Sequence, residues 1–479
     1  RYMIPKVKDH PALHSICLSN EPLSLDLQNC GFVRANWHAW LKAKHGSIDR
    51  VNELWGSKYG GFDEIPVPPP VFRPDPMVYD FVRYNQEEFA GFHRFLAETI
   101  HEMAPGLPVH AKMMICAVFG PSAHGPWSIA PELFGEFCEI NGNDAWRVYL
   151  PQGEWATSWQ DEIMGYELQR CAREAPVFNS EDHIIPDRNV NWQSPTYIYN
   201  VYWQGAVHGR GASSAWVWER TYDPASDFSG SILHRAECIE AIGHCTLDAN
   251  RLSDQITALQ QVKPPVAIVY ALSGFVYQPG YAGALSAAWR CSAFCGIKTG
   301  FVFERQLEAL ADGRKLGGYL SECRVIVLAG LRNLSARACE GLRSFVADGG
   351  KLVAVGEPPM VDEYGRPVEP ALPVAVRLES TKELELMARL REALSKVGVA
   401  PPVELIGQDG QPVYGVEHFA APWQGGWLVN VSNYRREEPT ANLRVGGRAV
   451  TSARNLILGH SVAFPDTIPS LQPLLLEVK

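Results

Sequence analysis

The chain has no Cys-x-x-Cys pair, no apolar run long enough to cross a bilayer and no excess of basic residues. The lack of basic excess argues against nucleic acid and anionic membranes as main partners, because 43 lysines and arginines against 53 aspartates and glutamates leave a net charge of −10. The lack of a long apolar run argues against a membrane-spanning helix. The 479 residues, 46% hydrophobic and 20% charged, have the composition of an ordinary globular protein with room for two or three domains.

The eleven cysteines are scattered along the chain. Their odd number and wide spacing favour reduced, buried thiols, which are typical of a reducing compartment. We therefore expect a cytoplasmic protein, although the stretch Arg1–Lys8 does not resemble a natural beginning and leaves an upstream signal peptide open. Cys291 and Cys295 lie four residues apart on an expected helix, a spacing that fits packing better than metal binding, so we expect no metal and no cofactor.

The first functional signal is the stretch 15–22, which reads Ser-Ile-Cys-Leu-Ser-Asn-Glu-Pro. A short apolar run bounded by Pro11 and Pro22 predicts a buried parallel strand with Asn20 and Glu21 at its carboxyl end. Barrels of alternating strands and helices build their active sites at that end, so a carboxylate there is well placed for chemistry. Capping of the following turn explains Glu21 equally well on this stretch alone.

A second carboxylate stands in the same setting. The stretch 175–183 reads Ala-Pro-Val-Phe-Asn-Ser-Glu-Asp-His, so Glu181 also closes a short apolar run after a proline. Glutamates at the ends of two parallel strands can face each other across a barrel mouth. Glycoside hydrolysis needs such a pair, one carboxyl to protonate the leaving oxygen and the other to attack the anomeric carbon or to activate water.

Asn20-Glu21, followed much later by Glu181, resembles the pattern of the clan A glycoside hydrolases. Those enzymes are (β/α)8 barrels that carry two catalytic glutamates on strands four and seven and retain anomeric configuration. The order of the later domains makes the chain similar to the family 42 β-galactosidases. The resemblance implies that Glu21 is the acid/base, that Asn20 holds a sugar hydroxyl and that Glu181 is the nucleophile. It also implies a carbohydrate substrate and a homotrimer.

Aromatic side chains support a carbohydrate site, because eleven of the fourteen tryptophans fall in the first 255 residues and aromatic faces suit the C–H faces of sugar rings. The resemblance places Trp218 under the sugar, at the end of an expected eighth strand over 212–219, with Trp216 deeper and in packing. His183 shares the face of the nucleophile if its strand continues, or it stabilises a turn. Tyr149, after the expected sixth strand, could hydrogen-bond the nucleophile.

The pattern of apolar runs divides the chain into three expected domains. Residues 1–255 alternate short apolar runs with helical segments, as βα units do, but supply only about five strands. A closed barrel needs eight strands. We therefore expect strands four to eight of a TIM barrel here, with the first three βα units in a missing N-terminal segment or a second polypeptide. An open half-barrel is the alternative.

Residues 264–382 predict a doubly wound, flavodoxin-like sheet, similar to the amidotransferase-like domain of family 42, which there mediates trimer contacts. We expect it to be catalytically silent, because the chain after the strand ending at Ala329 reads Gly-Leu-Arg-Asn-Leu-Ser, without the cysteine that an amidotransferase needs. Residues 401–479 predict a small C-terminal antiparallel β-sandwich.

For the whole chain we expect a retaining glycoside hydrolase that cleaves terminal β-galactosides. Pro22 after the acid/base weighs against galactose, as does Asp227 or Ser229 where the family often carries a sugar-binding glutamate. A related hydrolase of another β-linked oligo- or polysaccharide, such as a mannoside or an agar-type galactan, is therefore one alternative. A non-catalytic carbohydrate-binding protein on a degenerate barrel is the other.

Overall fold

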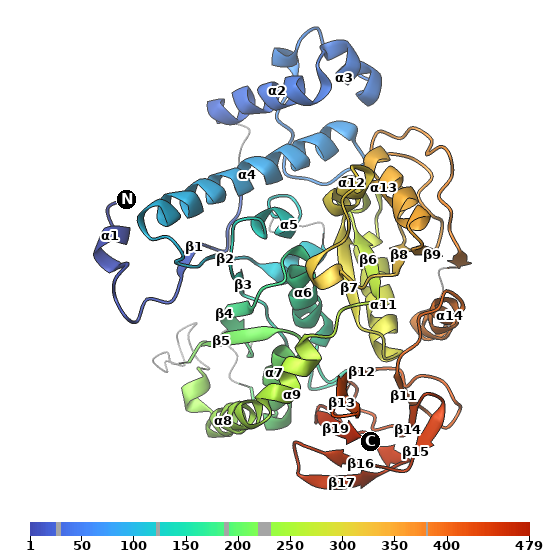
Figure 1. Cartoon of the computed structure of the whole chain (residues 1–479). Helices are drawn as coiled ribbons and strands as arrows, with labels where there is room; N and C mark the ends of the chain where they lie inside the picture. The colour runs from blue at the N-terminus through green and yellow to red at the C-terminus, as the bar shows by residue number, and fades with distance from the viewer. Residues whose placement is uncertain (25–29, 121–124, 186–190, 219–230, 380–381) are drawn as a thin grey trace.

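The strands of the protein form three groups that follow one another along the chain (Figure 1). The computed structural model describes six stretches, which are residues 1–24, 30–120, 125–185, 191–218, 231–379 and 382–479.

Five parallel strands make up the first group, and they lie in chain order. They are β1 (Ile16–Asn20), β2 (Val109–Lys112), β3 (Asn141–Asn143), β4 (Val177–His183) and β5 (Arg210–Trp216). β1 pairs with β2, and β3, β4 and β5 pair in that order. A parallel bridge between Met113 and Asn143 joins the two sets. The expected parallel strands that end near Asn20 and contain Glu181 are confirmed.

Helices separate these strands, as βα units require. They are α1 (Ile4–Val7), α2 (Gly31–His45), α3 (Ile48–Trp55), α4 (Pro76–Met103), α5 (Pro131–Phe134), α6 (Trp159–Ala172), α7 (Pro195–Val207), α8 (Ala236–Arg251) and α9 (Ser253–Gln260). α4 begins where the Asp75 side chain accepts the backbone N–H of Met77 and Pro76 takes the first helical position, both of which favour a helix start.

The two outer strands of this group differ from the central ones. Within the described stretches, β1 pairs only with β2, and β5 pairs only with β4. Every residue of β2 is buried, as expected for a parallel strand covered on both faces, whereas Cys17 and Asn20 of β1 and Ala212 of β5 are exposed. In the described part of the chain, the outer edges of β1 and β5 therefore have no paired strand.

The fifth strand is shorter than the expected 212–219. β5 ends at Trp216, because the chain leaves the sheet there and the carbonyl oxygens of Val217 and Trp218 accept the N–H groups of Ile232 and Leu233 instead. Trp218 thus lies beyond the strand.

The second group is a five-stranded parallel sheet in the order β10-β9-β8-β6-β7. Numbered within the sheet this is the 2-1-3-4-5 order of flavodoxin-like folds, so the expected doubly wound sheet is confirmed. Its strands are β6 (Val266–Tyr270), β7 (Thr299–Phe303), β8 (Val325–Ala329), β9 (Lys351–Val355) and β10 (Val376–Leu378). Its helices are α10 (Leu272–Tyr277), α11 (Tyr281–Phe294), α12 (Glu304–Ala311), α13 (Ala336–Ala347) and α14 (Glu383–Lys396).

Gly330 follows β8 at the position where an amidotransferase nucleophile would stand. Its φ of +59° belongs to the left-handed region, and a Cβ built on it would lie 2.6 Å from the Cβ of Ala284. The turn therefore requires glycine both for its backbone conformation and for its space.

The third group consists of two antiparallel sheets that share one apolar core, as the expected sandwich requires. One sheet has the order β11-β14-β15 with β18 beside β14, and the other has the order β12-β13-β19-β16-β17. The strands are β11 (Val403–Ile406), β12 (Val416–Trp423), β13 (Gly426–Asn433), β14 (Thr440–Val445), β15 (Arg448–Val450), β16 (Ser452–Asn455), β17 (His460–Ala463), β18 (Asp466–Thr467) and β19 (Leu474–Val478).

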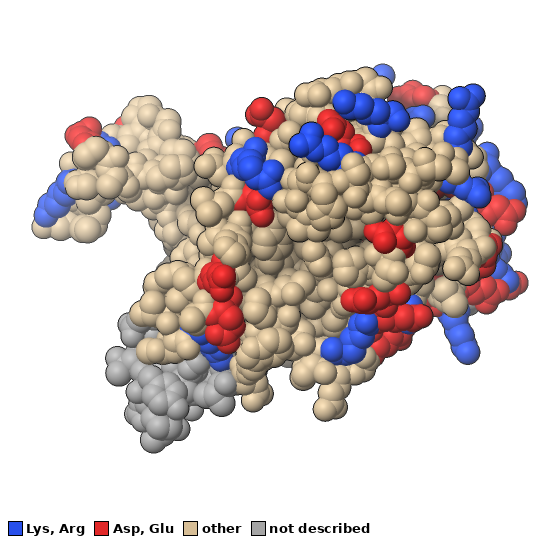
Figure 2. All heavy atoms as spheres, turned by 90° about the horizontal axis from the view of Figure 1, so that it is seen from below, with Lys and Arg blue, Asp and Glu red and all other residues tan. Residues whose placement is uncertain are grey.

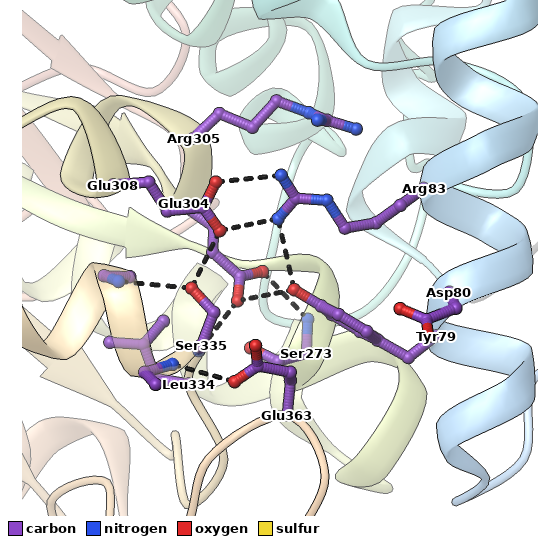
Figure 3. A network of polar contacts seen from close by, with 12 residues as sticks. Tyr79, Asp80, Arg83, Ser273, Glu304, Arg305, Glu308, Leu334, Ser335 and Glu363 are labelled. Carbon is purple, nitrogen blue, oxygen red and sulfur yellow. Dashed lines mark hydrogen bonds and ion pairs between the residues drawn. The ribbon is translucent and has the colours of Figure 1, made fainter. Parts of the chain in front are cut away.

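Helix α4 closes the edge of the second sheet at which its strands end (Figure 3). Arg83 on α4 donates hydrogen bonds of 2.6 and 2.8 Å to the Glu308 carboxylate, and the Tyr79 hydroxyl donates one of 3.2 Å to Glu304. Glu304 also accepts the backbone N–H groups of Ser273 and Ser335, which follow β6 and β8. Doubly wound folds usually bind ligands at this edge, but here polar side chains of α4 occupy it.

A buried junction joins all three groups. The His208 imidazole after α7 lies 2.7 Å from the Glu167 carboxylate on α6 and 3.1 Å from the Glu417 carboxylate on β12. The Lys298 ammonium, just before β7, lies 2.5 Å from Glu167. All four side chains are almost completely buried, so opposite charges are paired where water cannot reach them.

Candidate active site

Glu21 follows the last residue of β1 and faces the end of β2. Its backbone N–H donates to the carbonyl oxygen of Lys112, and its φ of +45° lies in the left-handed region, where a non-glycine residue costs on the order of 1–3 kcal/mol. Its side chain is 40% exposed. The backbone at Glu21 thus adopts a costly conformation that turns an accessible carboxyl away from the strand.

Glu181 lies within β4, and its carboxylate forms an ion pair with the ammonium group of Lys112, the last residue of β2. The same ammonium lies 3.9 Å from Oε1 of Glu21. Because the Lys112 side chain is only 6% exposed, one buried cation connects the two glutamates at the carboxyl ends of different strands. The structure therefore brings together the two predicted carboxylates.

A third carboxyl, that of Asp144, directly follows β3. Burial and the negative charge of Glu21 raise its pKa from the usual value to about 7, although Lys112 acts in the opposite direction. Asp144 is anchored by its own N–H, which donates to the carbonyl oxygen of Met113. Around neutral pH this group is therefore able to exchange a proton.

His183, at the end of β4, lies on the same face as Glu181. Its Nε2 is 3.2 Å from Oε1 of Glu181, which confirms that the two share a face, and its ring centroid is 5.8 Å from that of Trp216. Asp182 points to the other face, where it accepts hydrogen bonds of 2.5 Å from Arg210 and 2.6 Å from Ser213. Because side chains alternate between the two faces of β4, Glu181 and His183 lie on one face and the ion pair of Asp182 with Arg210 lies on the other.

The other predicted site residues lie at differing positions. Asn20 is exposed and pairs with Lys112 in the β1–β2 ladder, so it is a neighbour of both Lys112 and Glu21. Trp218 is 46% exposed. Tyr149 packs its ring against Tyr197, at 5.5 Å between centroids, and against Trp192, at 6.1 Å, so its hydrogen bond to the nucleophile stays a prediction.

Two residues named as possible departures from the family, Asp227 and Ser229, lie outside the described residues.

Sequence reasoning assigned no role to Lys112, Asp144 or Trp146. Lys112 ends a fully buried strand, and a charged residue in that setting is the available signal, because burial of a charge requires a partner. Trp146 is 44% exposed and forms a parallel bridge with His183, which places a second exposed indole beside the site.

Metal and membrane sites find no support in the described ranges. Over those ranges no three His, Cys, Asp or Glu side chains gather closely enough to hold a metal ion. Cys291 on α11 and Cys295 directly after it are buried, and their thiols donate to the carbonyl oxygens of Glu383 and Met387 on α14, which is packing. The helices described here include none that is long and apolar enough to span a membrane.

The surface carries both charge signs. Figure 2 shows lysines and arginines next to aspartates and glutamates over the face seen from below, so no patch of one sign covers that face.

The fold is an α/β fold of the type found in glycoside hydrolase family 42. Residues 1–127 match the family model described as glycoside hydrolase 42, β-galactosidase. The β-galactosidase bgaB of Geobacillus kaustophilus is 23% identical over 396 residues, which cover 76% of this chain and 54% of that protein. The chain is a homologue of the family 42 glycoside hydrolases, and it spans about half the length of this curated relative.

Solved structures of family 42 share the fold. An exo-carrageenase from Bacteroides ovatus superposes with a TM-score of 0.80 at 22% identity, over 94% of this chain and 63% of that one. A β-galactosidase from Bacillus circulans sp. alkalophilus gives a TM-score of 0.73 at 14% identity, over 100% of this chain and 81% of that one.

Proposed function

We propose that this chain is part of a retaining glycoside hydrolase that cleaves terminal β-galactosides. The observation that carries the proposal is the contact of one buried ammonium, that of Lys112, with carboxylates at the ends of two different parallel strands. The match of residues 1–127 to the β-galactosidase family model supports the same assignment.

In the proposed mechanism Glu181 is the nucleophile and Glu21 is the acid/base. Glu181 is held as an anion by Lys112, as a nucleophile must be. Glu21 is 40% exposed, so its carboxyl is accessible to a leaving oxygen, as the acid/base role requires.

The contact of both glutamates with the same ammonium group favours retention over inversion. Retaining enzymes hold them about 5–5.5 Å apart, whereas inverting enzymes leave about 6.5–9.5 Å for a water. A single ammonium group that contacts both fits the shorter span.

Four side chains form the proposed sugar site around these glutamates, namely Asn20, His183, Trp218 and Tyr149. Asn20 and His183 flank the catalytic groups directly. Trp218 is exposed beyond β5 and can stack on a sugar face. Tyr149 would have to reach the site from its packing against Tyr197.

The five parallel strands are, in this proposal, strands four to eight of a (β/α)8 barrel. The open edges of β1 and β5 would pair with three further βα units, carried by an additional N-terminal segment or a second polypeptide. The proposed domains are residues 1–255, 264–382 and 401–479, with the middle domain serving contacts in a homotrimer.

A second candidate substrate is a β-linked galactan of the agar or carrageenan type. The similarity in fold to an exo-carrageenase favours it, with a TM-score of 0.80 over 94% of the chain. Both candidates use the same two glutamates and differ only in the sugar that the site accepts.

Hydrolysis by the natural full-length protein, with Glu181→Gln as the variant, tests the proposal. Aryl β-galactosides, aryl β-mannosides and oligosaccharides of agar and carrageenan form the substrate panel. Glu181→Gln should abolish turnover of whichever substrate is cleaved, because the amide cannot attack the anomeric carbon. Glu174→Gln, a surface glutamate shortly before β4, is the matched control and should keep full activity. Unchanged turnover by Glu181→Gln would refute the nucleophile role, and sugar binding without turnover would point to a binding protein.

A further inference from the structure

We propose that Lys112 is a positioning residue that changes its ion-pair partner during the reaction, from Glu181 in the free enzyme to Glu21 in the glycosyl-enzyme intermediate. This inference rests on the proposed function and extends it to a residue outside the catalytic pair.

The geometry places the Lys112 ammonium between the two glutamates. It is paired with Oε2 of Glu181 and lies 3.9 Å from Oε1 of Glu21, already at the limit of an ion pair. The backbone carbonyl of Lys112 accepts the N–H of Glu21, so the same residue also fixes the acid/base through its main chain. The flexible four-carbon stem of lysine allows the ammonium to move between the two carboxylates.

Three other titratable side chains lie at the ends of the neighbouring strands, namely Asp144, His183 and Asp182. Asp144 from β3 lies near both Glu21 and Lys112, since both charges act on its pKa. His183 from β4 contacts the oxygen of Glu181 that does not pair with Lys112. Asp182 points away to Arg210. Lys112 therefore pairs with Glu181, lies 3.9 Å from Glu21 and acts electrostatically on Asp144.

The chemistry requires such a change of partner. In the first step an oxygen of Glu181 forms a bond to the anomeric carbon and the glycosidic C–O bond breaks. Its electron pair stays on the leaving oxygen, which takes the proton of Glu21. The negative charge of Glu181 disappears in the ester, and Glu21 becomes the anion. The second step reverses this as Glu21 takes a proton from water, whose oxygen displaces Glu181.

A lysine that could not follow this charge would lose its ion-pair partner Glu181 when the ester forms. The Lys112 side chain is 6% exposed, and a buried cation without a partner is strongly disfavoured. Pairing with Glu21 in the intermediate removes that penalty. It also favours the carboxylate form of Glu21, which is the form needed to act as a base on water.

The test follows the two steps separately in the natural full-length protein. A 2-deoxy-2-fluoro glycosyl fluoride of the sugar selected by the substrate panel traps the enzyme as an ester, detected by intact mass. Fluoride departs without help from an acid, so the trapping rate against pH reports the ionisation of Glu181. Reactivation of the trapped enzyme against pH reports the ionisation of Glu21 as a base.

Lys112→Met removes the charge, Lys112→Arg keeps it, and Lys112→Gln is the neutral variant to use if methionine prevents folding. In a neutral variant the acidic limbs of both the trapping and the reactivation profile should move upward by about 1–3 pH units, and Lys112→Arg should restore most of the shift. Lys263→Met removes another lysine that pairs with a glutamate, away from the site, and should move neither limb.

The outcomes separate the two proposals. Wild-type protein that is never trapped overturns the proposed function. Trapping with both limbs unmoved in the neutral variant overturns the role of Lys112 while leaving the hydrolase intact. A shift in the trapping limb alone shows that Lys112 serves only Glu181, and this overturns the change of partner.

Discussion

The backbone N–H of Glu21 donates a hydrogen bond of 2.9 Å to the carbonyl oxygen of Lys112. This bond connects the end of β1 to the end of β2 where the negative side chain of Glu21 and the positive side chain of Lys112 are close together. It also stabilises the left-handed backbone of Glu21, whose φ is +45°. The position of the carboxyl is therefore set by main-chain geometry, and substitution of its side chain should leave the fold intact.

Replacement of Glu21 by Gln should separate substrates by leaving group. Loss of a general acid slows the first step by about 10²–10⁴-fold for poor leaving groups, whereas a dinitrophenolate departs without protonation. Values of kcat/KM for dinitrophenyl and alkyl glycosides measure the difference, and Glu174→Gln serves again as control. An equal loss on both substrates would contradict the acid role.

Replacement of Asp144 by Asn should stabilise the protein at high pH only. Burial and the charge of Glu21 raise the pKa of Asp144 to about 7, so the charged form is unfavourable in the folded state and ordinary in the unfolded state. The free energy of unfolding of the wild type is thus lowered progressively as pH rises from about 4 through 7. Above pH 7 we expect the variant to gain up to roughly 3–4 kcal/mol in urea unfolding, and little below pH 4.

The exposed Asp348→Asn provides the comparison and should show no such pH-dependent gain. A gain by Asp144→Asn that is equal at both ends of the pH range would show that charge is not its cause.

Replacement of Asp80 by Asn should destabilise the protein most near neutral pH. Asp80 is fully buried, and although burial alone would raise its pKa, Lys44 and His45 lower it to about 2. Trp55 and Tyr364 complete its hydrogen bonds, at 3.0 Å each. A depressed carboxyl pKa contributes stability above the unfolded value of about 4, and this contribution is lost as pH falls toward 2.

Chemical denaturation across this range measures the effect of Asp80→Asn. We expect a loss of about 3–5 kcal/mol at neutral pH, because the four side chains bonded to Asp80 lose a charged partner, and a smaller loss near pH 2. The exposed Asp9→Asn is the control. A difference between variant and wild type that stays constant with pH would contradict the ionised state of Asp80.

Replacement of Lys298 by Met should weaken the contact among all three groups of strands together. It removes the Lys298 ion pair from the buried Glu167 carboxylate and leaves His208, Arg170 and the Tyr319 hydroxyl to offset its charge, which costs about 3–5 kcal/mol. Calorimetry should show one transition at a lower temperature. Lys396→Met, which breaks an exposed pair with Glu392, should leave the free energy of unfolding nearly unchanged, because solvent screens that pair. Two separate transitions in the wild type would contradict the junction.

Much of the fold was predictable because it depends on local patterns. Apolar runs next to prolines identify β1 and β4, and the apolar runs within residues 264–382 indicate the class of the second sheet, whose strand order only the structure gives. The end of β5 was not predictable, because the hydrogen bonds that stop it at Trp216 come from residues 232 and 233, far along the chain.

The candidate site also has features that the sequence predicts and features that it does not. Glu21 and Glu181 follow from their positions at strand ends, and their common contact with Lys112 does not, because it depends on the register of β1 against β2 and on how three strands twist past one another. Tyr149 was expected from its strand, yet the chain turns after β3 and carries its ring to Tyr197. Contacts between side chains of different strands depend on how the strands pair and twist, which the sequence of each strand alone does not determine.

The junction of Glu167, His208, Lys298 and Glu417 bears on how such a protein evolves. Along the chain the three groups of strands look like modules that recombination could exchange. Each, however, supplies a charge that the others neutralise. A transplanted module would bring a buried ion without its counterion, so exchange of one group alone would destabilise the protein.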